Sequence, residues 1–419
     1  MANRRQFLRR SVAIATAGAF AGCTGQESDQ TPTTEPTGTK TSSANSSDTI
    51  KIGSLHPLAP PLTQLATQGK KGVEVTVEQI NKAGGIDGRQ VELITENTEG
   101  DPQTALQKAK RLVEQENVDM LYGAIVSSSA LAITEYANQQ NVAYFTNASA
   151  DPLTGPKCQQ STFVLNPSEA MRAGAMAPVM VERSGAKGWI HIYDFAWGYS
   201  VDKAFTAALE AQDANVDIQD VTKSPLSETD FSNSISQIAS ADIDWLLLGL
   251  GGTGLSTFLK QAAQYGLKDQ VDIYGPEAVQ SARRDAAADI KGMVTHGRYS
   301  STYDTEPNKV FVEAFTDKHD LPPTQNSKDG WEGVNLYKAA VEENGSTAFD
   351  DVVSATEKIE IDSLMGPLSM RACDHRCQRP IHVAEVGEPD EYDIPAFDFI
   401  ESLPAENVMP ACEETGCNL

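Results

Sequence analysis

The segment Gly249-Leu-Gly251-Gly-Thr-Gly254 carries the strongest enzymatic signal in this 419-residue chain. It fits the G-x-G-x-x-G pattern that brings a backbone close to the pyrophosphate of a dinucleotide. It lies between a predicted strand and a predicted helix, and Asp272 follows 18 residues after Gly254, near the spacing of a ribose-binding acid. An NAD-dependent oxidoreductase is therefore one hypothesis, although such a motif normally follows the first strand of its unit and this one lies in the second half.

Five cysteines beyond the N-terminal region offer a second chemistry, namely Cys158, Cys373, Cys377, Cys412 and Cys417. In an oxidising compartment disulfides are expected. An odd number leaves one thiol free or paired elsewhere, and the sequence does not give the pairing. The spacing of Cys373, His375 and Cys377, with the two late cysteines, also falls within some zinc-site ranges. Disulfides are favoured over zinc, so no metal is expected.

Ser127-Ser128-Ser129 follows a predicted strand and opens a predicted helix. Free N–H groups and the helix dipole favour an anion at such a place. A simple helix cap is the alternative. The chain contains no nucleophile elbow, no H-E-x-x-H motif and no P-loop, so no enzyme is expected.

Strands and helices alternate along the chain, and this order decides where the residues above must lie. Strands are predicted at 49–55, 91–95, 118–122, 188–193, 244–249 and 271–274, and helices at 65–83, 102–115 and 129–140. The alternation predicts an α/β fold with parallel sheets covered by helices on both faces. Ligands then bind at the carboxyl ends of the strands. The tail from Glu388 to Leu419 carries few strand or helix signals.

The N-terminal sequence is typical of an export signal. Arg4-Arg5 and Arg9-Arg10 precede a short apolar run from Ser11 to Ala21, a pattern typical of twin-arginine export. Residues 1–22 are assigned to a lipoprotein signal that ends before Cys23, the expected lipid attachment site. Residues 23–48 form a predicted disordered linker, because 12 of the 25 residues from Thr24 to Asp48 are Ser or Thr.

The formal net charge of −25 excludes nucleic acid as an expected partner, because phosphate binding needs a basic face. Removing residues 1–22 removes four arginines and no acid, so the mature chain carries −29. Self-repulsion of this size destabilises a compact fold unless salt screens it. A salt-rich habitat is one hypothesis, and an ordinary acidic protein outside the cytoplasm is the alternative.

Several segments, taken in order, resemble the type I periplasmic solute-binding proteins. They are Asn81–Arg89, Asn97–Pro102, Gly123–Ser129, Asn147–Thr154, Asp194–Gly198, Tyr274–Glu277, Gly366–Leu368 and Cys373–His375. The closest group is the leucine/isoleucine/valine and amide-binding (hydrophobic amino acid uptake) proteins of ABC importers. The resemblance implies two Rossmann-like lobes with parallel sheets, joined by three hinge crossings and closing like a Venus flytrap. The expected lobes are 49–167 with 298–384, and 168–297 with 385–419.

The resemblance also implies a ligand site. Ser127, with its neighbour Ser128, falls where the family holds the ligand's α-carboxylate. Ala148 and Ala150 match positions that meet the head group, although Ala150 lacks the hydroxyl of some members. Glu277 stands where amine-binding members keep an acid that pairs with the ligand's ammonium.

Three further positions follow from the same comparison. Trp197 matches an aromatic residue that closes over the ligand, with Tyr199 as its neighbour, and packing between lobe and loop is the alternative for Trp197. The family also has a glycine-rich loop at the place of Gly249–Gly254, which weakens the dinucleotide hypothesis. Thr253 lies where several members have tyrosine, which implies a different pocket shape.

The expected function is capture of a small solute outside the cytoplasm and its delivery to an ABC permease in the membrane. The solute is a branched-chain amino acid or a related small amino acid, amide or urea. A lipid-anchored monomer without a cofactor is expected. A ligand-binding sensor and the NAD-dependent enzyme remain the alternatives.

Overall fold

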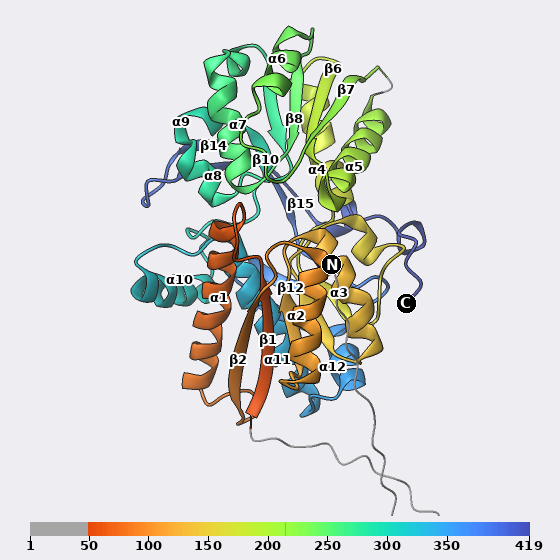
Figure 1. Ribbon diagram of the computed structural model, residues 1–419, viewed down its shortest axis with the longest axis vertical. Helices are drawn as coiled ribbons and strands as arrows, with labels where there is room; N and C mark the ends of the chain where they lie inside the picture. The colour runs from red at the N-terminus through yellow and green to blue at the C-terminus, as the bar shows by residue number, and fades with distance from the viewer. Residues whose placement is uncertain (1–48, 214) are drawn as a thin grey trace, which may run out of the picture. The chain divides into compact units, whose positions relative to one another are not determined.

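A computed structural model describes residues 49–213 and 215–419. The expected signal (1–22), the linker (23–48) and Cys23 therefore lie outside the described residues. All described residues belong to one compact unit. Two larger sheets dominate it, and Figure 1 shows each sheet with its own helices.

The first sheet has five parallel strands in the order β2-β1-β3-β4-β5. Its strands are β1 (Thr49–His56), β2 (Gln90–Asn97), β3 (Met120–Gly123), β4 (Ala143–Thr146) and β5 (Thr162–Val164). Its helices are α1 (Thr63–Lys82), α2 (Pro102–Glu114), α3 (Ser127–Gln139), α10 (Glu306–His319), α11 (Gln325–Asn344) and α12 (Phe349–Thr356). We call this part the first lobe, together with a small antiparallel sheet of β11 (Glu360–Ser363), β12 (Gly366–Met370) and β13 (Cys377–Gln378).

Alternating side chains of the first sheet serve two hydrophobic cores. Ile50 and Ile52 of β1 pack with α1 and α11 on one face. Leu55 packs with α2 and α3 on the other face. Because both faces of β1 are covered, six of its eight residues are buried, among them the polar Ser54 and His56.

The second sheet has seven strands in the order β15-β14-β10-β9-β8-β6-β7. They are β6 (Lys187–Tyr193), β7 (Asp217–Ser224), β8 (Trp245–Gly249), β9 (Asp272–Gly275), β10 (Val294–His296), β14 (Ile381–Pro389) and β15 (Pro395–Leu403). Its helices are α4 (Glu169–Arg183), α5 (Ala196–Gln212), α6 (Ser232–Ser240), α7 (Gly252–Gln264), α8 (Gln280–Asp285) and α9 (Ala287–Ile290). We call this part the second lobe.

The last two strands differ from the prediction of parallel sheets. β14 pairs antiparallel with β10, and β15 pairs antiparallel with β14. β15 also lies in the tail that carried few strand signals, so the expectation for 395–403 was wrong. All of β14 belongs to the second sheet, and this strand runs across the expected lobe boundary between residues 384 and 385.

The chain passes between the lobes at 165–168, 297–305 and 379–380, and the tail then returns toward the first lobe. Ala405 is buried in the hydrophobic core of the second lobe, and Val408 packs against that core. Two disulfides anchor the residues beyond, Cys373–Cys412 and Cys158–Cys417. Cys377 is a buried free thiol. Disulfide bonding of these four cysteines removes the zinc alternative, and the described residues hold no cluster of metal-ligating side chains.

Within 49–213 and 215–419, no helix is long and apolar enough to cross a bilayer.

Candidate functional site

A cavity of about 70 Å³, partly open to solvent, lies between the two lobes. The first lobe contributes Leu62, Leu65, Ile125, Val126, Asn147 and Ser149, and the second contributes Tyr193, Phe195, Trp197, Leu226, Gly251 and Glu277; Arg298 comes from a connection between them. Each of these residues ends a parallel strand or follows its carboxyl end. The cavity therefore occupies the place at which open α/β sheets bind ligands.

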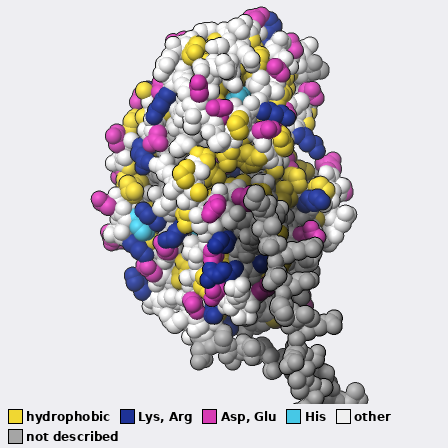
Figure 2. All heavy atoms as spheres, in the orientation of Figure 1, with side chains coloured by type: hydrophobic (Ala, Val, Ile, Leu, Met, Phe, Trp, Pro, Cys, Tyr) yellow, Lys and Arg dark blue, Asp and Glu magenta, His cyan; other side chains and the backbone are white. Residues whose placement is uncertain are grey.

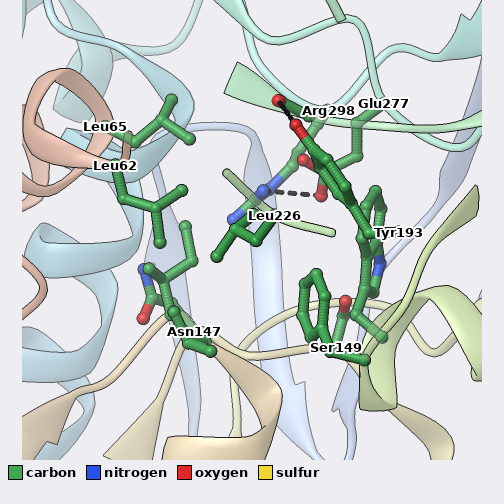
Figure 3. Close-up of a pocket in the computed structure, with 13 residues that line it drawn as sticks. Leu62, Leu65, Asn147, Ser149, Tyr193, Leu226, Glu277 and Arg298 are labelled. Carbon is green, nitrogen blue, oxygen red and sulfur yellow. Dashed lines mark hydrogen bonds and ion pairs between the residues drawn. The ribbon is translucent and has the colours of Figure 1, made fainter. Parts of the chain in front are cut away.

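Most of the cavity wall is apolar. Figure 3 shows Leu62 and Leu65 on one side and Tyr193 on the other. The rings of Tyr193, Phe195 and Trp197 lie within 6.5 Å of one another, measured between centroids. The site can therefore enclose an apolar group, and its few polar side chains must orient the ligand.

The carboxylate of Glu277 has two cationic partners. Its Oε1 accepts from Arg298 Nη1 at 2.9 Å and lies 3.0 Å from Arg172 Nη1. Arg298 also pairs with the buried Asp329 of α11. Burial opposes ionisation of Asp329, but Arg298 and Lys328 hold its pKa below the ordinary value.

Behind this ion pair lies Glu169, the first residue of α4. It is fully buried, and its Oε1 lies 3.1 Å from Arg172 Nη1. The same oxygen accepts hydrogen bonds from Ser149 Oγ and Trp197 Nε1, each at 2.8 Å. Desolvation raises the pKa of Glu169 to about 7, although Arg172 acts in the opposite direction.

Comparison with known proteins agrees with this geometry. The sequence profile of the family described as periplasmic binding protein matches residues 49–391. The chain belongs to this family. A relative in Brucella melitensis, Leu/Ile/Val-binding protein homolog 4, is 24% identical over 368 residues, covering 82% of this chain and 85% of that protein.

Two solved structures show the same type I fold as this periplasmic binding protein. A periplasmic binding protein from Burkholderia mallei superposes with a TM-score of 0.82 at 20% identity, covering 88% of this chain and 98% of the other. An ABC transporter solute-binding protein from Rhodopseudomonas palustris, in complex with 3,4-dihydroxybenzoic acid, gives a TM-score of 0.79 at 20% identity, with 86% and 98% covered. The resemblance and the α/β fold expected from the sequence are confirmed. The family is one of solute-binding proteins, which is not an enzyme class.

Two of the expected site residues line the cavity of this periplasmic binding protein, namely Trp197 and Glu277. Four others, Ser127, Ser128, Ala148 and Ala150, do not line it. Ser127 is buried, and its Oγ accepts from the backbone N–H of Ala150 at 3.4 Å. Their roles in binding stay predictions. Helix α3 begins at Ser127, two residues earlier than expected, so Ile125 and Val126 form the cavity wall instead.

Tyr199 and Thr253 are both exposed. Tyr199 donates to Asp194 Oδ1 at 2.6 Å and lines a second groove beside the tail. Thr253 lies in the first turn of α7 and does not line the cavity. A ligand contact from either residue also stays a prediction.

The glycine-rich loop has a packing explanation. Gly251 lines the cavity, and its carbonyl accepts from Tyr193 Oη at 3.0 Å. A β-carbon at Gly254 would collide with the same hydroxyl. The glycines therefore leave room for the side chain of Tyr193 to lie against the backbone of this loop. This packing role removes the main support for the dinucleotide hypothesis.

Sequence reasoning missed most of the charged cluster. Glu169 and Arg172 are three residues apart on α4, in a segment where the pattern gave only a break between lobes. Arg298 follows β10, a three-residue strand that was not predicted. A correct prediction of β10 would have placed Arg298 just beyond the carboxyl end of a strand, where ligands bind in such sheets.

Proposed function

We propose that this protein is the extracytoplasmic substrate-binding component of an ABC importer and binds a branched-chain amino acid or a related small amino acid, amide or urea. The observation that carries the proposal is the cavity between the lobes, which combines an apolar wall with a few polar groups. Family membership supports capture of a small solute. The relative in Brucella melitensis is named as a homolog of leucine-, isoleucine- and valine-binding proteins.

Lobe closure is the proposed mechanism. A solute that contacts residues of both lobes shifts the protein toward its closed form, because it binds that form more tightly. A membrane permease then recognises the closed form. Twin-arginine export and a lipid anchor on Cys23 complete the proposal and place the protein outside the cytoplasm.

The first test is a thermal-shift screen in molar salt with amino acids, amides, urea and NAD. Leucine, isoleucine or valine is expected to raise the melting temperature, since binding to the folded state stabilises it. NAD serves as the negative control. A screen in which no amino acid, amide or urea shifts the transition contradicts this function.

An aromatic carboxylate is the second candidate solute. The specific observation is that Glu277 is already paired with Arg172 and Arg298, which reduces its capacity to hold a ligand's ammonium. Arg298 itself lines the cavity and offers a positive group to a carboxylate. The ring cluster of Tyr193, Phe195 and Trp197 suits a planar ligand.

Glu277→Gln separates the two candidates. If Glu277 holds an ammonium, the variant lowers leucine affinity by about 10-fold to 100-fold, the range of a charge-assisted hydrogen bond. It leaves 3,4-dihydroxybenzoate affinity little changed. Calorimetry with both compounds measures the difference, and equal effects on both would remove Glu277 from ammonium recognition.

A further inference from the structure

One carboxylate oxygen joins side chains of the two lobes at the cavity floor. Glu169 Oε1, on α4 of the second lobe, accepts from Ser149 Oγ of the first lobe and from Trp197 Nε1 of the second, each at 2.8 Å. Ser149 and Trp197 both line the cavity. The other oxygen of Glu169 is buried without a hydrogen-bond partner.

The backbone holds Glu169 in place at the first crossing between the lobes. Its N–H donates to Asp151 Oδ1 at 2.9 Å, and Ala170 N–H lies 3.4 Å from the same oxygen. Asp151 belongs to the first lobe, in the short helix Asp151–Thr154. The contacts of Glu169 therefore span the hinge through both its backbone and its side chain.

We propose that Glu169 is a positioning residue for solute binding, which fixes Ser149 and Trp197 relative to each other and so sets how the two lobes meet around the ligand. The inference rests on the proposed solute-binding function and adds its regulation by pH. When Glu169 is ionised, it accepts charge-assisted hydrogen bonds, which are stronger than those to a neutral carboxylic acid. Protonation weakens the link between the lobes.

The charges around Glu169 come from four elements. Arg172 on its own helix favours ionisation, while Asp151 and Glu277 oppose it. Arg376, which precedes β13, also interacts with Glu169 and favours its ionisation. Because desolvation raises the pKa of Glu169 to about 7, the change falls near neutral pH.

The histidines are not expected to change charge in this pH range. All six have a pKa below the ordinary value of 6.5, in each case because burial disfavours the charged imidazolium. A transition between pH 6.5 and 8 that is present in the wild type and lost in Glu169→Gln therefore reports Glu169 rather than a histidine.

A first experiment needs no solute. Tryptophan emission is recorded from pH 5.5 to 9 for the wild type, Glu169→Gln and Trp197→Phe. The wild type is expected to show a transition near pH 7 that both variants lack. Ser149→Ala, which removes a hydrogen bond that lowers the pKa of Glu169, is expected to move the midpoint upward. A wild-type transition that persists in Glu169→Gln overturns the proposal.

A second experiment measures affinity at pH 6 and pH 8 with leucine and with 3,4-dihydroxybenzoate, whose carboxylates stay ionised throughout. Whichever compound binds is expected to bind about five-fold more tightly at pH 8, and this difference disappears in Glu169→Gln. Glu385→Gln is the matched control, because Glu385 is exposed and pairs with Arg183 away from the cavity.

The two experiments separate the proposals. If no compound of the thermal-shift screen binds to the wild type, the proposed function fails while the emission transition still reports the state of Glu169. Equal pH dependence in the wild type and Glu169→Gln overturns the role of Glu169 even when a solute binds. If Glu169→Gln does not fold, the midpoint shift in Ser149→Ala carries the test, and an unchanged midpoint contradicts it.

Discussion

Glu169 also links the stability of the protein to pH. Its pKa rises from 4.5 to about 7 on folding, so between these values the folded state holds a proton that the unfolded chain has lost. The resulting stability is complete below pH 4.5 and is lost as the pH rises through 7. Urea unfolding of the wild type and Glu169→Gln tests this. The wild-type free energy of unfolding, relative to the variant, should fall by about 3 kcal/mol from pH 4.5 to pH 8. A constant difference would contradict the linkage.

Among the residues that line the cavity, Arg298 is expected to contribute most to the free energy of unfolding. It pairs with both Glu277 and Asp329, so Arg298→Leu leaves two acids short of a partner in a buried site. We expect a loss of about 3–5 kcal/mol in the free energy of unfolding. Arg183→Leu is the control, because the Arg183–Glu385 pair is about 40% exposed on both sides and should contribute less than about 1 kcal/mol. Similar losses in both variants would contradict the argument.

At the scale of elements, local patterns predicted the strands that are buried on both faces. β1, β6 and β8 lie within one residue of the expected bounds, because each carries at least three buried aliphatic or aromatic residues. β15 escaped prediction because it lies at the edge of its sheet, where exposed and half-buried residues give no apolar run. The charged cluster escaped as well, since Arg172, Glu277 and Asp329 come together only through tertiary structure.

Helices α1 and α11 offer a direct test of packing. A β-carbon at Gly72 would collide with the backbone of Ser327 on α11, whereas one at Gly69 would lie 3.4 Å from His56 Nδ1. Gly72→Ala should therefore destabilise the protein by about 1–3 kcal/mol despite the better helix propensity of alanine. Gly69→Ala, one turn away, should be neutral or slightly stabilising. Chemical denaturation of both variants measures the two free energies of unfolding. Equal values would contradict the close approach of Gly72 to α11.

At the scale of the whole molecule, the net charge of −25 remains to be explained. Figure 2 shows acidic and basic side chains spread over the surface, with hydrophobic side chains gathered across the middle of this face. We propose that the acidic excess is an adaptation to salt. The melting temperature should rise steeply between dilute buffer and molar KCl, where the Debye length falls to about 3 Å. Sucrose, which does not screen charge, is the control. Full stability in dilute buffer contradicts the proposal.

The disulfides of the tail hold the two lobes together covalently, in addition to the three connections of the chain between them. Cys158 and Cys417 are 259 residues apart, so their bond closes the second lobe and much of the first into a covalent ring. The Cys373–Cys412 bond adds a smaller ring inside it. A protease that cuts once between residues 297 and 305 opens the outer ring without releasing a fragment. The cut protein should migrate as one species on a non-reducing gel and as two after reduction, so breakage of a single connection leaves the solute-binding body in one piece.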